Sequence, residues 1–354
     1  MNIYALFALL NGALARFLAP LRDGQWVLLF VVGTVASLFV LSIQDLPDVP
    51  VYKDMFQNTP ALWAVITDPS VLASIYGEPG YLVANSVIKT IYQDYGVFRF
   101  IVVFAALALK LWVIRRLSPN YAFAVFFYFA LFFYFDSFVL RQSLAAALIG
   151  VALYCLFRGH RAWFVLWSLL AASFHVSALC VLPLYFFIRF DPSRLLALTI
   201  VVAALALGAI NVGNLMIDLV IQYSGFDYIS RKLIRYTTSA HSESLGLFRG
   251  STMLYTLALL CFAALRPWLR DRLRYYPQIL VVCLYAYLLF VGFNSFGIMG
   301  DRLFRLFGLF FCVVFASFSL CINRDDRFVF AVAIIPISVL VLFAMSPDLL
   351  LTGL

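Results

Sequence analysis

Long apolar runs recur along this chain at the spacing of membrane-crossing segments, and they constrain its fold more than any other feature. A helix needs about 20 mainly apolar residues to cross the hydrocarbon core of a bilayer. Of the 354 residues, 65% are hydrophobic and only 12% are charged, which leaves too few polar groups to cover a soluble surface. The sequence therefore predicts an all-α, polytopic helical membrane protein with about ten full spans. We place them near 3–19, 25–43, 97–114, 121–138, 141–157, 195–220, 248–265, 277–293, 303–321 and 329–345.

The whole chain, residues 1–354, is expected to form a single integral membrane domain, because there is no room for a soluble one. Clusters of arginine orient it, since basic loops stay in the cytoplasm. The remaining external segments are expected near 44–96, 221–247 and 294–302. The basic clusters are Arg22, Arg115 and Arg116, Arg158 and Arg161, Arg189 and Arg194, Arg266 to Arg274, and Arg324 and Arg327.

The apolar stretch 162–188 conflicts with a series of simple crossings, because the basic clusters on both sides of it should be cytoplasmic. It is long for one span and too short for two. His175 lies at its middle and Pro183 in its second half. We expect a broken, re-entrant pair of half-helices here, and one tilted span with Arg189 outside is the alternative.

Arginines on the predicted external side are the strongest functional signal, because they run against the topological bias. A guanidinium keeps its charge and binds oxyanions through a fork of donors. A cation at membrane depth is costly and is a functional candidate by default. Several forks around one external cavity would suit a phosphate or diphosphate. The seven are Arg99, Arg141, Arg231, Arg235, Arg249, Arg302 and Arg305.

Simpler explanations exist for each of these arginines. Long side chains at span ends often extend to the membrane surface as anchors, and others make local ion pairs or face water. Such roles apply as follows: Arg99 and Arg249 as anchors, Arg141 paired with Asp136 or a loop carbonyl, Arg302 paired with Asp301, and Arg231 and Arg235 in water.

Glu78 and His175 are the candidates for proton transfer. Glu78 lies in YGEPGYL, residues 76–82, where the following proline biases it away from helix. His175 is the one histidine within an apolar run, and it could bind an anion or relay a proton near neutral pH. The plainer alternatives are a turn carboxylate facing water and a core histidine bonded to Ser173 or Ser177.

Other chemistries find no support in the sequence. G-x-S-x-G, H-E-x-x-H and Walker A motifs are absent. Three scattered histidines predict no metal site, and the six cysteines, none in a C-x-x-C pair, are interpreted as small apolar residues. The net charge of +8 lies mostly in short loops, so topology explains it and no nucleic-acid partner is expected.

Five short motifs occur in an order that resembles the EpsG-like family of bacterial membrane proteins. The resemblance extends over roughly residues 45 to 310, and the ordered set is more specific than any one motif. The motifs are a loop with Asp48 and Tyr52, EPGY at 78–81, RQSLA at 141–145, FHVSAL at 174–179 and DRLFRLF at 301–307.

The resemblance implies a function. Members of this family are regarded as Wzy-type polysaccharide polymerases, which join repeat units carried on undecaprenyl diphosphate at the outer face of the bacterial cytoplasmic membrane. It also implies an architecture like that of the GT-C glycosyltransferases and no cofactor or metal. Expected partners are the lipid-linked glycan donor and acceptor, membrane lipids, a flippase and a chain-length regulator.

The candidate residues divide into two groups under this hypothesis. In the catalytic group, Arg141 and Arg302 would bind the diphosphate with His175 assisting, and Glu78 would take the proton from the acceptor hydroxyl. In the substrate-binding group, Arg305 would assist on the diphosphate, and Tyr81 and Gln142 would order the sugar. The other substrate-binding candidates are Asp48, Tyr52, Tyr228, Arg231 and Arg235.

Two other functions use the same features. A polysaccharide or O-antigen ligase would share the lipid-diphosphate donor and differ in its acceptor. A transporter or flippase for an anionic lipid-linked glycan would need access from both faces and preferably an internal repeat. The sequence shows no repeat and does not reveal the acceptor.

Overall fold

The computed structural model describes residues 24–43, 48–72, 75, 77–223 and 246–321, and every regular element in that part of the chain is helical. The all-α prediction is therefore confirmed. The predicted spans 3–19 and 329–345 lie outside the described residues, as do Tyr228, Arg231 and Arg235.

The first half of the described chain contains several long helices and a group of short ones. Its elements are α2 (Gly24–Ser42), α3 (Val49–Asn58), α4 (Leu62–Thr67), η1 (Pro69–Leu72), α5 (Pro79–Ile91), α6 (Tyr95–Leu117), α7 (Tyr121–Leu131), α8 (Phe133–Asp136) and α9 (Leu140–Phe157).

The second half contains several helices that end early or bend. Its elements are α10 (Arg161–Phe174), η2 (Val176–Val181), α11 (Leu184–Phe187), α12 (Arg194–Ala209), α13 (Val212–Tyr223), α15 (Gly250–Ala264), α16 (Arg266–Leu269), α17 (Tyr276–Gly292), α18 (Gly297–Arg305), α19 (Gly308–Ser317) and η3 (Phe318–Cys321).

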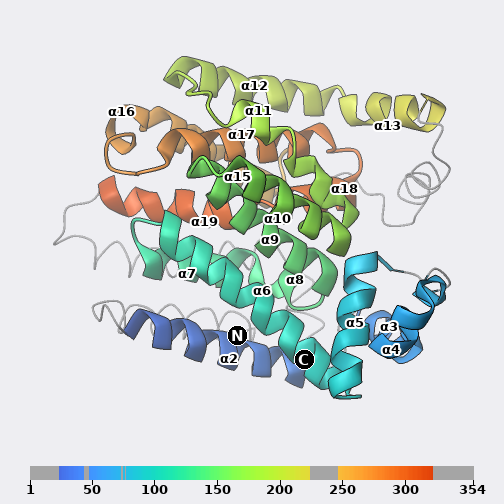
Figure 1. The fold of residues 1–354 in the computed structure, drawn as a ribbon. Coiled ribbons are helices and arrows are strands. Elements are labelled where there is room, and N and C mark those ends of the chain that lie inside the picture. The colour runs from blue at the N-terminus through green and yellow to red at the C-terminus, as the bar shows by residue number, and fades with distance from the viewer. Residues whose placement is uncertain (1–23, 44–47, 73–74, 76, 224–245, 322–354) are drawn as a thin grey trace.

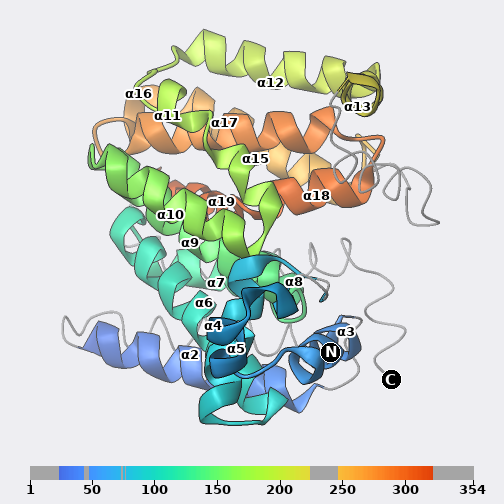
Figure 2. The ribbon, with the colours of Figure 1, turned by 45° about the vertical axis from the view of Figure 1, so that its right-hand side comes forward.

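The longer helices form a bundle with roughly parallel axes, and α9 lies inside it (Figures 1 and 2). Of the 18 residues of α9, 89% are buried, so its surroundings are protein on nearly every side. Small residues allow this burial by letting neighbouring backbones approach. At Gly150 an added Cβ would lie 2.6 Å from Cδ2 of Leu309 in α19. The bundle is thus built around the helix whose first turn carries Arg141.

The count of about ten full spans is not confirmed. Among the described residues, two helices are long and apolar enough to cross a membrane, α6 and α9, or three if the bent pair α18 and α19 counts as one span. The shorter apolar helices have 10–17 residues. The difference arises because several predicted spans are broken. The pairs α7 and α8, α12 and α13, and α18 and α19 replace the predicted runs 121–138, 195–220 and 303–321.

Two of these breaks have a visible cause or shape. Asn211, between α12 and α13, has a φ of 54°, a left-handed conformation that ends the first helix. The axes of α18 and α19 differ by 65°. As a result, most of the predicted external segment 294–302 is the helix α18 rather than a loop, and Arg302 lies within it.

The stretch 162–188 is broken near His175 and turns back on itself. The helix α10 ends before His175, and η2 and α11 return beside it (Figures 1 and 2). The ring of Tyr185 lies 6.1 Å from that of Phe164 and 5.2 Å from Cζ of Arg161, both at the start of α10. Tyr285 donates a 2.6 Å hydrogen bond to the Cys180 carbonyl and so satisfies part of the irregular backbone.

The segment that follows the hairpin contacts another predicted cytoplasmic cluster through Asp191. Asp191 pairs with Arg266 at 2.8 Å and with Arg270 at 2.7 Å. These contacts join the chain after the hairpin to the two ends of α16. Arg99, in contrast, is not the expected surface anchor, because it is only 1% exposed and donates a 2.9 Å hydrogen bond to the Ile43 carbonyl.

The helices α3, α4 and α5 form a separate small group at one end of the bundle (Figure 1). This group lies within the predicted external segment 44–96. Lys89 ties α5 to the end of α3, since its Nζ donates to the carbonyls of Phe56, Gln57 and Thr59 at 3.1, 2.7 and 2.7 Å. The three helices therefore form one unit, which lies beside the start of α9 and the end of α10.

Candidate functional site

The centre of the site is the carboxylate of Glu78, whose two oxygens face a guanidinium and an imidazole. Its Oε2 accepts a hydrogen bond from Nη1 of Arg141. Its Oε1 lies 3.4 Å from Nδ1 of His175. The three side chains are 9%, 16% and 11% exposed, so water reaches each of them only in part. Three residues that the sequence predicted to act together are thus in contact.

Local sequence explains why these three side chains meet. Glu78 is the N-cap of α5, where Pro79 starts the helix and holds Glu78 in extended conformation. His175 is the C-cap of α10, also extended, at the point where the hairpin turns. The two helix ends approach closely at Gly80. An added Cβ there would lie 2.3 Å from Oγ and 2.9 Å from the carbonyl oxygen of Ser173.

Tyr52 forms the next wall of the site, against Arg141. The guanidinium carbon of Arg141 lies 5.5 Å from the centre of the Tyr52 ring, and the Tyr52 hydroxyl hydrogen-bonds to Arg141. Burial raises the pKa of Tyr52, although Arg141 opposes the shift. The Tyr52 hydroxyl therefore stays protonated at physiological pH.

Tyr81 lies behind Tyr52 and is completely buried. The two ring centres are 5.6 Å apart, and Phe98 of α6 contacts Tyr81 edge-on, also at 5.6 Å. Its place in the fold is that of a support for Tyr52.

Asp48 and Arg302 complete the charged group. Asp48 is the N-cap of α3, and its carboxylate interacts electrostatically with Arg302 and Arg141. Desolvation raises the pKa of Asp48, and the two guanidinium groups oppose this shift. The site thus contains two arginines, two carboxylates and one histidine, brought together from the starts of α3, α5 and α9, the end of α10, and α18.

Gln142 fixes the position of α18 relative to α9. Its Nε2 donates a 2.8 Å hydrogen bond to the carbonyl of Arg302, and the residue is 2% exposed. A direct contact between two segments 160 residues apart therefore joins the start of α9 to the backbone of α18 at Arg302.

Arg305 lies apart from this group. Its Nε donates to Asp301 at 2.5 Å, one turn earlier in α18, and its guanidinium carbon lies 4.1 Å from the centre of the Phe135 ring. Asp301, considered as a partner of Arg302, pairs with Arg305. Likewise, Asp136, considered as a partner of Arg141, pairs with Lys110.

The sequence reasoning missed Lys110, which no candidate group included. It is the single lysine within the apolar run 97–114, and an intramembrane cation is itself a signal of a special role. Its Nζ lies 2.5 Å from Oδ2 of Asp136. Among the described residues, no group of three or more His, Cys, Asp or Glu side chains could hold a metal ion.

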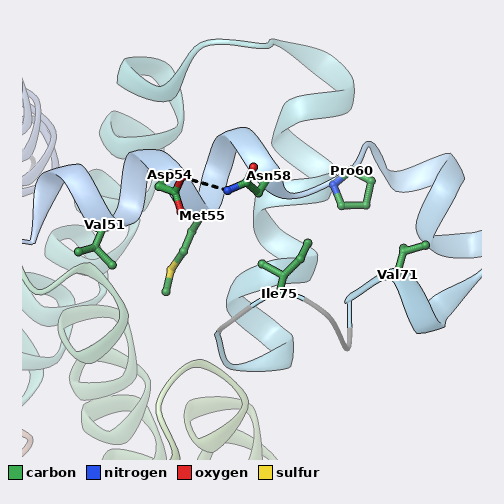
Figure 3. Close-up of a pocket in the computed structure, with 7 residues that line it drawn as sticks. All are labelled: Val51, Asp54, Met55, Asn58, Pro60, Val71 and Ile75. Carbon is green, nitrogen blue, oxygen red and sulfur yellow. Dashed lines mark hydrogen bonds between the residues drawn. The ribbon is translucent and has the colours of Figure 1, made fainter.

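A cavity of about 620 Å³ lies on a neighbouring face of α3. Asp54 and Asn58 line it side by side, joined by a 3.0 Å hydrogen bond from Asn58 Nδ2 (Figure 3). Its other lining residues are apolar, and they come from α3, from η1 and from the segments that follow them. They are Val51, Met55, Pro60, Val71 and Ile75.

Comparison with known families identifies the group to which this chain belongs. A model of the EpsG family matches residues 25–349, nearly the whole chain. The chain belongs to the EpsG family. The resemblance drawn from five motifs is therefore confirmed, and all the contacts around Glu78 lie within the region that the EpsG model matches. No curated protein and no solved structure matches the chain.

Membership in the EpsG family supports a membrane protein of polysaccharide biosynthesis with a polymerase-like activity. The apolar helices of the structure agree with a membrane location. In this EpsG protein, the charged group around Glu78 is the candidate active site.

Proposed function

We propose that this EpsG protein is a glycosyltransferase that joins oligosaccharide repeat units carried on undecaprenyl diphosphate into a polysaccharide. The reaction takes place at the outer face of the bacterial cytoplasmic membrane, and a GT-C-like arrangement of helices holds the site. The observation that carries this proposal is the contact of Arg141 and His175 with one buried carboxylate, Glu78, with Arg302 nearby.

The arginines supply what the leaving group needs. When the bond between the anomeric carbon and the diphosphate oxygen breaks, negative charge builds on the diphosphate. Positive groups placed in advance stabilise that charge most effectively in a site with little water. Arg141 and Arg302 are such groups, since neither guanidinium loses its charge and Gln142 joins the two helices that carry them.

The contacts of Glu78 refine the role predicted for it. The sequence hypothesis made Glu78 the base, but one of its oxygens accepts a hydrogen bond from Arg141 and the other faces His175. A carboxylate beside a guanidinium and an imidazole is a weak base and a good orienting group. We therefore assign the proton to His175, whose Nδ1 lies 3.4 Å from the Glu78 carboxylate.

In the proposed reaction, one bond to the anomeric carbon forms and another breaks. The acceptor hydroxyl oxygen attacks the anomeric carbon of the donor, and the bond from that carbon to the diphosphate breaks. The hydroxyl proton moves to Nε2 of His175, and the diphosphate leaves as an anion beside Arg141 and Arg302. The order of carboxylate, imidazole and hydroxyl is one that general-base sites commonly use.

The cavity beside Asp54, on the helix that also carries Asp48 and Tyr52, is the place we assign to the sugars of the repeat unit. Its volume is within the range of small-molecule sites. Asp54 and Asn58 offer an acceptor and donors to neighbouring hydroxyls, and the apolar walls suit the C–H faces of a sugar ring. Since α3 carries Asp48 and Tyr52 as well, one helix would contact both the diphosphate region and the glycan.

Genetic complementation tests the function. The gene is deleted in its host and replaced by wild type, by Arg141→Ala or by Arg249→Ala, the last being an exposed arginine at the start of α15. Surface and carrier-linked glycans are separated on gels, and membrane blots check protein levels. The polymerase is supported if the deletion strain and the Arg141→Ala strain carry single repeat units at the surface, while wild type and Arg249→Ala carry long chains.

Other patterns support the rival functions. Long chains that remain on the lipid carrier identify a ligase. Repeat units that never reach the outer face identify a transporter or flippase. Normal surface polymer in the deletion strain overturns the proposal.

A further inference from the structure

A buried polar cluster joins four helices beside the proposed site, and the proposed reaction does not use it. Lys110 of α6 donates to Asp136 at 2.5 Å and to Oγ of Ser143 at 3.0 Å. Tyr128 of α7 donates to the same oxygen of Asp136 at 2.7 Å. Lys110 is 2% exposed, and the Asp136 side chain is 14% exposed. The four residues come from α6, α7, α8 and α9.

The position of the cluster in the chain connects it with Arg141. The two residues that Lys110 binds, Asp136 and Ser143, lie five residues before Arg141 and two residues after it. Between them the chain leaves α8 and enters α9, and Val139 has the non-helical angles φ −94° and ψ 68°. The lysine ammonium therefore bridges the break from which the first turn of α9 starts.

The cluster also lies next to Arg305. Phe135 precedes Asp136, and its ring is the one that the Arg305 guanidinium covers. Asp136 interacts electrostatically with Arg305 as well. A movement of the α8–α9 break would therefore change the surroundings of both Arg141 and Arg305.

Stability alone does not account for a charged pair at this place. Taking two charges out of water is expensive, and replacing a buried pair by apolar residues of similar size is often neutral. Charged residues inside membrane segments are rare for the same reason. A buried ion pair does hold the helices that it joins in one arrangement, because each charged side chain has few alternative partners.

We propose that Lys110 and Asp136 are positioning residues, which fix the α8–α9 break and thereby aim Arg141 at the diphosphate. This inference rests on the proposed function. It matters for rate because an error of about 1 Å in the placement of a catalytic group can cost about 100-fold.

Two variants and one control test the inference in protein reconstituted in nanodiscs. The variants are Lys110→Met and the double variant Lys110→Met/Asp136→Met, which leaves no unpaired charge. The control is Tyr287→Phe, which removes a different buried hydrogen bond, that between Tyr287 and Thr256 at 2.6 Å. The measurements are kcat and KM with a lipid-linked repeat unit, the thermal unfolding midpoint, and amide hydrogen exchange.

We expect the double variant to unfold within a few degrees of wild type and to lose about 100-fold in kcat with little change in KM. Amides 140–145 should exchange at least about tenfold faster, while those of 150–157 keep their wild-type rates. Wild-type kcat in the double variant overturns the inference. So does a kcat loss accompanied by an equal loss of folded protein, or by unchanged exchange at 140–145.

The two proposals fail in different ways. If wild-type protein makes no polymer from the repeat unit, the proposed function fails, and the exchange rates at 140–145 still decide whether Lys110 fixes the break. If wild type polymerises and the double variant does so equally well, only the positioning inference fails.

Discussion

Nδ1 of His175 lies 3.4 Å from Oε1 of Glu78, although the two residues belong to different helices and are far apart in the chain. Their meeting depends on two helix ends, the start of α5 and the end of α10, which touch at Gly80 and Ser173.

If Glu78 acts by orienting His175, the two residues contribute to the rate as one unit. His175→Gln should lower kcat by about 100-fold or more, within the range of a general base. Adding Glu78→Gln to it should cost little further, because the unit is already broken. Polymerisation rates of both single variants and the double variant give the coupling. Effects that simply multiply would show that the residues act separately.

Replacing Arg141 by lysine keeps the charge and removes the fork. Since a lysine ammonium cannot contact Glu78, Tyr52 and a phosphate with the same geometry, Arg141→Lys should lose about 100- to 1000-fold in kcat. Arg249→Lys is the control. Rates are measured by gel analysis of the polymer. Near-normal rates in Arg141→Lys would show that charge is sufficient.

A methyl group at position 80 should separate α5 from α10. The added Cβ of Gly80→Ala would meet both the side chain and the backbone of Ser173. Rotation of the serine side chain would therefore leave the clash with the backbone in place. We expect about 1–3 kcal/mol of lost stability and a larger relative loss of activity. Gly292→Ala is the matched control, because nothing lies within 4 Å of its Cβ. Equal behaviour of the two variants in thermal unfolding and polymerisation would contradict the close approach.

Asp48 should make stability depend on pH. Desolvation raises its pKa above the ordinary value of 3.8, so the folded state holds the proton more tightly than the unfolded chain does. Its contribution to stability is therefore fully present below 3.8 and is lost as pH rises through the raised pKa. Asp48→Asn cannot ionise, so it should gain stability relative to wild type over that interval and keep the gain above it. Thermal unfolding of both proteins from about pH 4 to pH 8 measures the difference. Parallel curves would show that Asp48 is not desolvated.

Removal of Asp54 or Asn58 should weaken glycan binding more than it slows the reaction. A lost hydrogen bond to a charged group costs about 1.5–3 kcal/mol, so Asp54→Ala should raise KM for the repeat unit about tenfold or more with kcat little changed. Lys53→Ala, on the same helix but not at the cavity, is the control. An unchanged KM in both cavity variants would remove sugar binding from this cavity.

The sequence predicted much of the site because its residues occur in short motifs at breaks. Pro79 after Glu78 marks a helix start, and a lone histidine in the middle of 162–188 marks the point where that stretch turns. The charges of Arg141 and Glu78 then favour each other wherever the fold allows contact. Family membership confirmed the reading of these motifs as one set.

Partner choice and helix breaks needed the structure. Whether Asp136 pairs with Arg141 or with Lys110 depends on which helices are neighbours, and a linear sequence does not contain that information. The break at Asn211 depends on a left-handed backbone conformation, and the bend between α18 and α19 on packing around it. Apolar periodicity alone joined each of these pairs into one span.

The hydrogen bond from Gln142 to the Arg302 carbonyl has a consequence for substrate choice. It joins Gln142, the neighbour of Arg141, to the backbone of Arg302, so the backbone positions that carry the two arginines are tied together inside the bundle. In the proposed site, a headgroup with two linked phosphates can therefore bind both arginines at once. A single phosphate leaves one guanidinium without its anion.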